Sequence, residues 1–295
     1  MTAPQGLHQA LSMLIFGPSK VGKSLTGAST PPPRVILDVE SAARFLPLKA
    51  ITWESNNPPP AAPKVKNGEP EWDTAVVPVR AWQDAVRVLD WLKQGEHPFV
   101  SATVDSISEL QYRYIESVTG RDQMKIQDWG SALREVGGFV RDLRDLTMHP
   151  TKPLSAVVIT AMAKPDAQTG QMKPYLQGQL GTQIPYLPDV TAYLHVEPGE
   201  GGVETRYLET RRNSLWEAGE RVGGRIPATL ALPQVTGTTL EEIRAKNTTF
   251  SKIIKMVYAG MGIAEPAVTA PTAPAAAGDQ AVSTDAAATT NTQEN

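Results

Sequence analysis

The chain of 295 residues contains no cysteine, and this absence excludes a disulfide framework and a thiolate metal site. Its histidines are few and lack the spacing of metal ligands; they are His8, His97, His149 and His195. The sequence also lacks a long hydrophobic run near its beginning, because residues 11–16 are too short for a signal peptide or a membrane span. We therefore expect a cytoplasmic protein with no membrane partner.

An excess of charge of one sign is missing as well. The formal net charge is -3, and residues 264–295 contribute four acids and no Lys or Arg to it. The rest of the chain then carries 28 basic against 27 acidic residues, a net charge of +1. Net charge therefore gives no support for tight nucleic-acid binding, although a local basic stripe would still bind a phosphate backbone.

Composition divides the chain into a domain and a tail. With 41% apolar residues, the chain has enough material for one globular domain, which we place at 1–261. Residues 262–295 are rich in Ala, Thr and Pro without periodicity, which predicts disorder. The tail has few charges and no aromatic residue, so a passive linker is favoured over a peptide that recruits a partner. The proline-rich stretch at about 55–71 is predicted to be an inserted surface loop.

Short β-branched runs alternate with amphipathic stretches, which predicts an α/β fold with a mostly parallel sheet flanked by helices. The expected strands are 11–16, 35–39, 75–79, 99–104 and 155–160, followed by 190–196 and 206–210 as an antiparallel extension. Apolar residues repeat every three or four positions within 82–92, 107–118 and 129–146, which predicts three helices. Their apolar stripes are expected to pack in the core.

The segment from Gly17 to Ser24 reads GPSKVGKS and matches the pattern G-x-x-x-x-G-K-[ST] in full. It lies between an apolar strand and a helix-compatible run, which favours a phosphate-binding loop over a simple glycine turn. Lys23 should reach the β- and γ-phosphates of ATP, and the Ser24 hydroxyl should bind Mg²⁺. The expected cofactors are therefore ATP and Mg²⁺. The residues assigned to the nucleotide are Gly17, Pro18, Ser19, Lys20, Val21, Gly22, Lys23, Ser24 and Leu25.

A phosphate-binding loop of this kind works with a carboxylate at the end of a second strand, which supports the metal ion. The run from Phe99 to Val104 is an apolar strand that ends in Asp105, and we assign Asp105 to Mg²⁺ and to catalysis. The alternative is that Asp105 or Ser106 only caps the helix that begins at Ile107. Capping by Ser106 is compatible with a metal-binding Asp105.

Hydrolysis also requires a group that orients and deprotonates the attacking water. The second expected strand ends in Asp38, Val39 and Glu40, and Glu40 is nearer the carboxyl end, where open α/β sheets bind ligands. We therefore predict Glu40 as the catalytic base. The alternatives are that Glu40 is an ordinary solvated loop acid, or that Glu109 takes this role from the next helix.

With these elements in this order, the chain resembles the RecA-like P-loop ATPases over roughly residues 8–232. It is most similar to the phage-encoded RecA-like family of AAA-like nucleotide-binding proteins associated with recombination and single-strand annealing. Residues 35–42 (VILDVESA) look like the strand with the catalytic Glu, and residues 104–107 (VDSI) look like the strand that ends in Asp-Ser. Residues 157–162 (VVITAM) are similar to the sensor strand, but Thr160 or Ala161 stands where RecA has Gln.

The resemblance implies a loop at 164–188 that contacts single-stranded DNA, with Lys164, Lys173 and Tyr175 as the contact residues. Cations and an aromatic side chain suit backbone contact and base stacking, although an ordinary surface loop would explain the same composition. It also implies a homo-oligomer, a ring or a filament, in which an arginine reaches the neighbour's γ-phosphate. Arg221 is the first candidate, followed by Arg212 and Arg225, and the alternative is that these arginines are solvated or paired internally.

The leading hypothesis is an ATPase stimulated by single-stranded DNA that acts in recombination or repair through annealing, strand exchange or loading of another protein. A second hypothesis is a nucleotide-dependent switch for a replication or recombination partner, such as a single-strand-binding protein, with little turnover. A P-loop kinase is a third, although no arginine-rich lid separate from the amphipathic stripes is evident. Phosphate release with and without DNA distinguishes the first two.

Overall fold

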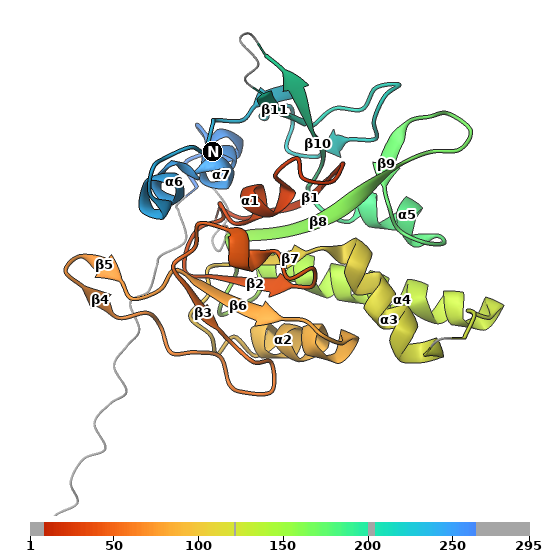
Figure 1. Ribbon diagram of the computed structural model, residues 1–295, viewed down its shortest axis with the longest axis horizontal. Helices are drawn as coiled ribbons and strands as arrows, with labels where there is room; N and C mark the ends of the chain where they lie inside the picture. Colours follow the sequence, from red (N-terminus) through yellow and green to blue (C-terminus); the bar gives the residue numbers. More distant parts are fainter. Residues whose placement is uncertain (1–8, 121, 200–203, 264–295) are drawn as a thin grey trace, which may run out of the picture.

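The computed structural model describes residues 9–120, 122–199 and 204–263 (Figure 1). Its main sheet has the strand order β13-β11-β10-β1-β8-β7-β2-β6-β3. The parallel strands are β1 (Leu11–Gly17), β2 (Arg34–Asp38), β3 (Ala50–Thr52), β6 (Thr74–Pro78), β7 (Ser101–Asp105), β8 (Ala156–Pro165) and β10 (Val190–Pro198). Antiparallel pairing adds β9 (Met172–Pro174), β11 (Glu204–Glu209), β12 (Gly219–Glu220) and β13 (Thr229–Ala231).

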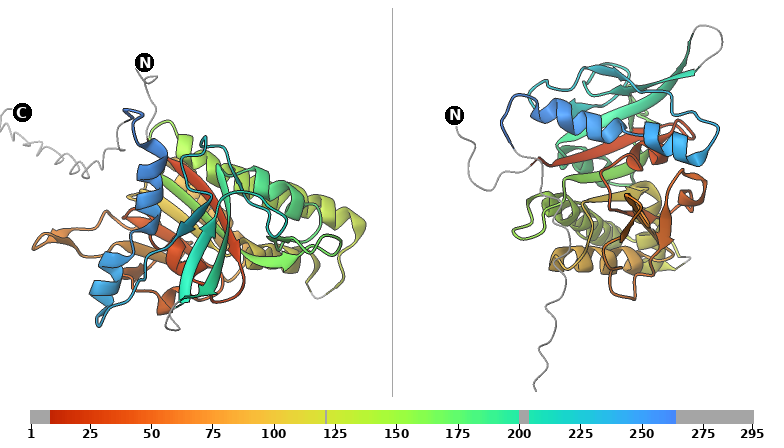
Figure 2. Two further views of the ribbon diagram at one scale, coloured as in Figure 1. Left: turned by 90° about the horizontal axis from the view of Figure 1, so that it is seen from above. Right: turned by 90° about the vertical axis from the view of Figure 1, so that its left-hand side faces the viewer.

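Helices cover both faces of this sheet (Figures 1 and 2). One face carries α2 (Trp82–Gln94), α3 (Ile107–Thr119) and α4 (Ile126–Asp145), and the other carries α1 (Lys23–Gly27), α6 (Leu240–Lys246) and α7 (Thr249–Tyr258). Shorter helical segments are α5 (Leu180–Gln183), η1 (Ala43–Phe45), η2 (Leu146–Met148) and η3 (Ile184–Tyr186).

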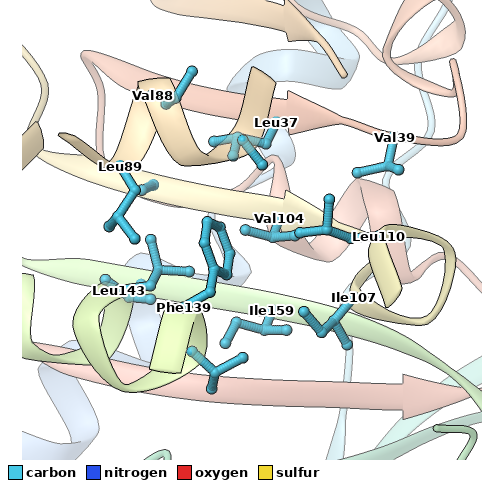
Figure 3. Close-up of a cluster of buried hydrophobic side chains, with 14 of the residues drawn as sticks. Leu37, Val39, Val88, Leu89, Val104, Ile107, Leu110, Phe139, Leu143 and Ile159 are labelled. Carbon is cyan, nitrogen blue, oxygen red and sulfur yellow. The ribbon is translucent and has the colours of Figure 1, made fainter. Parts of the chain in front are cut away.

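The strand pattern explains why both faces are covered. Strand β1 is buried along its whole length, as parallel strands between two helical layers are. Its alternate side chains serve the two cores: Leu14 packs on the side of α2, α3 and α4, whereas Met13 packs on the side of α7. In the first core the ring of Phe139 from α4 lies between strand and helix side chains, among them Val104 and Ile159 (Figure 3).

Each strand and helix expected from the sequence has its counterpart, with shifted ends. The predicted antiparallel extension is wrong for one neighbour of β10: this strand pairs in parallel with β1, from Met13 opposite Val190 to Phe16 opposite Tyr193, and is antiparallel only to β11 and β12. Only β11, β12 and β13 form the antiparallel extension. Residues 164–188 carry the chain back to the edge of the sheet at which β1 begins. Strand β10 therefore starts at the same edge as β1 and runs parallel to it.

The structure adds elements that the sequence analysis did not predict. Within the proline-rich stretch, β4 (Val65–Lys66) and β5 (Glu69–Pro70) form a small hairpin that projects from the domain (Figure 1). Helices α6 and α7 follow the extension, and Asn247 between them donates a hydrogen bond to the Leu25 carbonyl of α1 at 2.9 Å. The carboxyl-terminal helices therefore support the short helix α1. The predicted disordered tail, apart from residues 262 and 263, lies outside the described residues.

Buried His97 makes the stability of the fold sensitive to acid. Its ring stacks on Phe99, and its Nδ1 accepts the Phe99 N–H at 3.2 Å. Burial, and then the nearby Lys152 and His149, lower the pKa of His97 from 6.5 to about 4. Between these values the unfolded chain binds a proton that the folded chain does not, so the free energy of unfolding falls as pH drops from about 6.5 to 4, by roughly 3 kcal/mol in total.

His97→Asn keeps an acceptor for the Phe99 amide and removes the titrating group. We expect the variant to lose less stability between pH 7 and about 4.5 than the original chain does. Urea unfolding at several pH values measures this difference. An unchanged pH dependence would show that another group is responsible.

Candidate nucleotide-binding site

The loop from Gly17 to Ser24 joins β1 to α1, and two of its glycines are required by its geometry. A Cβ on Gly17 would lie 2.1 Å from the Leu194 carbonyl oxygen of β10, which leaves no space for a side chain. Gly22 has a φ of 98°, a conformation that side chains other than glycine rarely adopt. These two glycines allow the backbone to turn sharply away from the sheet.

The side chain of Lys23 folds back over this loop. Its ammonium donates to the carbonyls of Gly17 at 3.0 Å and Pro18 at 2.6 Å. Burial lowers the pKa of Lys23, while the carboxylates of Glu40 and Asp105 act in the opposite direction. The two predicted acidic residues therefore lie near the predicted phosphate-binding lysine.

Asp105 is the last residue of β7 and is only 4% exposed. It accepts a hydrogen bond from the hydroxyl of Thr160, a fully buried residue of the neighbouring strand β8. This contact fixes the orientation of the carboxylate. Thr160 lies in the strand that resembles the sensor strand, but its contact with Asp105 is not predicted from the sequence.

Glu40 follows the end of β2 in a tight turn. The buried carboxylate of Asp38 accepts the amides of Ala42 at 2.9 Å and Ala43 at 3.3 Å and so closes this turn. Glu40 is exposed at its tip, and its Oε1 accepts a hydrogen bond from the Ser106 hydroxyl. Burial raises the pKa of Asp38 despite these amide contacts. Asp38 thus supports the turn, and Glu40 is the carboxylate that is exposed to a ligand.

Ser106 has two partners. Its Oγ accepts the backbone amide of Glu109 at 3.4 Å, which makes Ser106 the N-cap of α3, and it donates to Glu40. The predicted helix cap at Ser106 is therefore confirmed, while the metal-binding role of Asp105 stays a prediction. Glu109, the rival base, lies within ion-pair distance of Arg113 at 3.4 Å.

The arginines predicted to act in a neighbouring subunit do not lie at this chain's own phosphate loop. Arg221 follows β12, which pairs with the first residues of β10, at the amino end of β1; its guanidinium donates to the Tyr186 carbonyl. Arg221 and Arg212 line a cavity of about 220 Å³ there. Arg225 donates to the Val257 carbonyl of α7 at 2.9 Å.

The residues predicted to contact DNA lie on the β8–β9 hairpin and just after it. The Lys164 ammonium lies 5.2 Å from the centre of the Tyr175 ring, so the structure brings these two together. Lys173 forms an ion pair with Asp166 at 2.9 Å, and this contact helps to hold the pKa of Asp166 well below its usual range. The loop is therefore less basic than its lysines suggest.

One residue that the sequence analysis missed lies directly against the phosphate loop. Arg206 of β11 places its guanidinium beside Gly22. Within an alternating strand such an arginine resembles an ordinary exposed residue, so only the pairing of β10 with β11 could have indicated its position.

Within the described residues no cluster of three or more His, Asp or Glu side chains could hold a metal ion by itself. The donors present, the Ser24 hydroxyl and the Asp105 carboxylate, are oxygen ligands of the kind that Mg²⁺ prefers when phosphates and water complete its shell. Residues 9–120, 122–199 and 204–263 include no helix long and apolar enough to span a membrane.

Comparison with known proteins places the chain in a family. A model of the AAA domain matches residues 9–222, and the chain belongs to this family. Its fold is a mostly parallel sheet flanked by helices, as predicted, and its domain is a P-loop nucleotide-binding one.

No curated protein matches the chain. Among solved structures, the flagellar accessory protein FlaH from Methanocaldococcus jannaschii is similar at 11% identity with a TM-score of 0.40, over 79% of this chain and 88% of that chain.

Proposed function

We propose that the protein binds ATP with Mg²⁺ at the Gly17–Ser24 loop and hydrolyses it. The observation that carries this proposal is the convergence of Lys23, Asp105 and Glu40 at the carboxyl ends of β1, β7 and β2. A phosphate-binding cation, a metal-supporting carboxylate and a candidate base are the groups that ATP hydrolysis requires. A simple glycine turn or a helix cap would not need all three in one place.

Each residue has a separate task in this proposal. The Lys23 ammonium exchanges its loop carbonyls for phosphate oxygens, and Ser24 and Asp105 hold the metal ion, which neutralises charge on the phosphates when bound. Glu40 orients the attacking water and accepts its proton. Thr160 keeps the Asp105 carboxylate in position through its hydrogen bond.

We further infer that hydrolysis is coupled to single-stranded DNA, in annealing, strand exchange or loading during recombination or repair. Helix α3 supports this inference, because its N-cap is Ser106, the partner of Glu40. Two residues later the Ser108 hydroxyl donates to the Tyr175 carbonyl at 2.8 Å and accepts the Met162 amide at 3.0 Å.

The next turn of α3 continues this connection. Gln111 exchanges two hydrogen bonds with the backbone of Gln177, at 3.1 and 2.8 Å, and the hydroxyls of Tyr112 and Tyr175 lie 3.0 Å apart. A ligand that displaces residues 175–177 would therefore act on α3 and on the Ser106–Glu40 contact. By reciprocity, nucleotide binding would alter the affinity of the loop for that ligand.

The same proposal includes a ring or filament in which an arginine completes the neighbour's site. Arg221 lies at the opposite end of β1 from the phosphate loop of its own chain, so it can reach a triphosphate only in another subunit. Arg212 is exposed beside it.

One experiment tests these proposals together: phosphate release from Mg-ATP across a titration of single-stranded DNA, with particle size measured with and without nucleotide. Stimulated release that weakens as salt rises supports the DNA-coupled ATPase. Tight ATP binding with no release would favour the switch, and release that DNA leaves unchanged would remove the coupling. A particle that stays monomeric with ATP and DNA would contradict the assembly.

A further inference from the structure

Arg206 lies on the part of the sheet that extends past the end of β1. The pairing of β1 with β10 ends at Phe16 and Tyr193, whereas β10 and β11 continue beyond that point with Leu194 opposite Leu208 and Val196 opposite Arg206. This extension runs alongside the loop that leaves β1. Leu194 and Leu208 belong to the core on the side of α7, so by alternation Arg206 is on that face as well.

The contact between Arg206 and the phosphate loop is close. A Cβ built on Gly22 would lie 2.8 Å from Nη1 of Arg206 and 3.3 Å from its Cδ. The guanidinium and the end of its aliphatic stem therefore pack on the backbone of Gly22, the residue that precedes Lys23. Any side chain at position 22 would push Arg206 away from the loop.

Among the described residues the guanidinium has few partners. Nη2 donates to the Pro233 carbonyl at 2.9 Å, which anchors the side chain. Burial lowers the pKa of Arg206, and no described carboxylate offsets this effect. A guanidinium carries five N–H donors, and a partly buried cation without a counter-ion gains more than a solvated one when an anion arrives.

We propose that Arg206 binds the α- and β-phosphates of the nucleotide in the same chain whose Gly17–Ser24 loop holds it. The loop amides next to Gly22 are those that cradle these two phosphates in such loops, and a guanidinium fits phosphate oxygens through two parallel N–H groups. This inference rests on the proposed nucleotide binding. Arg206 would act on the nucleotide of its own chain, whereas Arg221, Arg212 and Arg225 would act from a neighbouring subunit.

Arg206→Gln tests this assignment by calorimetric titration with Mg-ADP, a non-hydrolysable Mg-ATP analogue and Mg-pyrophosphate. We expect each to bind about 10- to 100-fold more weakly, because a charged hydrogen bond is lost in every case. The slope of affinity against salt should also become shallower. The matched control is Arg134→Gln, which removes an exposed arginine of α4 and should leave all three affinities unchanged.

Arg206→Lys keeps the charge and most of the stem, and it should lose less affinity than Arg206→Gln because only the fork is removed. Thermal unfolding without nucleotide separates a structural role from a binding role, and we expect equal midpoints. If Arg206→Gln unfolds at a lower temperature than the original chain, the affinities of Arg206→Lys are compared with those of the original chain instead.

Wild-type affinities in both Arg206 variants, or weaker ADP binding with unchanged pyrophosphate binding, would overturn the assignment. If the original chain binds no Mg-nucleotide, the proposed function fails as well, and the two failures are thereby distinguished.

Discussion

Lys23→Ala should abolish ATP hydrolysis while leaving the fold intact. Lys23 is the ammonium predicted to bind the β- and γ-phosphates, and removal of one such preorganised charge commonly costs about 100- to 1,000-fold in turnover. Its present contacts are two carbonyls of its own loop, at Gly17 and Pro18, so the loss in stability should be only about 1 kcal/mol per contact. Phosphate release at saturating Mg-ATP, read together with thermal unfolding, measures both effects.

A matched control is Lys66→Ala, which removes an exposed lysine of the β4–β5 hairpin. Its turnover should equal that of the original chain. Wild-type turnover in Lys23→Ala would defeat the assignment of the phosphate loop, and unfolding of that variant would mean that the loop depends on Lys23 for its shape.

The sequence predicts those parts of the site that have a signal in residues adjacent in the chain. The phosphate loop is a local pattern, and Glu40 and Asp105 each follow an apolar strand. Because parallel strands end at one edge of the sheet, residues that follow strand ends meet there, even when they are far apart in the chain. That rule is sufficient to place Lys23, Glu40 and Asp105 together.

Local rules of this kind cannot predict the contacts of residues whose position depends on which strands pair and in what register. Thr160 contacts Asp105 because β8 lies directly between β1 and β7, and Arg206 reaches Gly22 because β10 and β11 extend past β1. Neither relation has a local signal, since both require the strand order of the whole sheet. Parallel pairing of β10 was missed for the same reason.

Other omissions did have a signal. Thr239 accepts the amide of Glu242 and caps α6, and this Thr-x-x-Glu spacing is a recognised helix start. In α7 the buried side chains of Phe250, Ile253 and Val257 recur at steps of three and four. These helices matter to the site because Asn247, between them, holds the carbonyl of Leu25 in α1.

Glu40→Gln separates binding from chemistry. The amide keeps the size of the side chain and an oxygen that can accept the Ser106 hydroxyl, while the group that would take a proton from water is gone. We expect turnover to fall about 100- to 10,000-fold, the usual contribution of a general base, with nucleotide affinity retained. Calorimetry and single-turnover phosphate release measure the two quantities separately.

Glu109→Gln is the control for this experiment, because Glu109 is the rival base and lies close to Arg113. It should leave turnover almost unchanged. The reverse outcome, an active Glu40→Gln and an inactive Glu109→Gln, would move the base to α3 and leave Glu40 as a partner of Ser106 alone. If Glu40→Gln holds ATP without hydrolysis, any assembly that forms on ATP and DNA should persist in this variant, because the step that would release it no longer occurs.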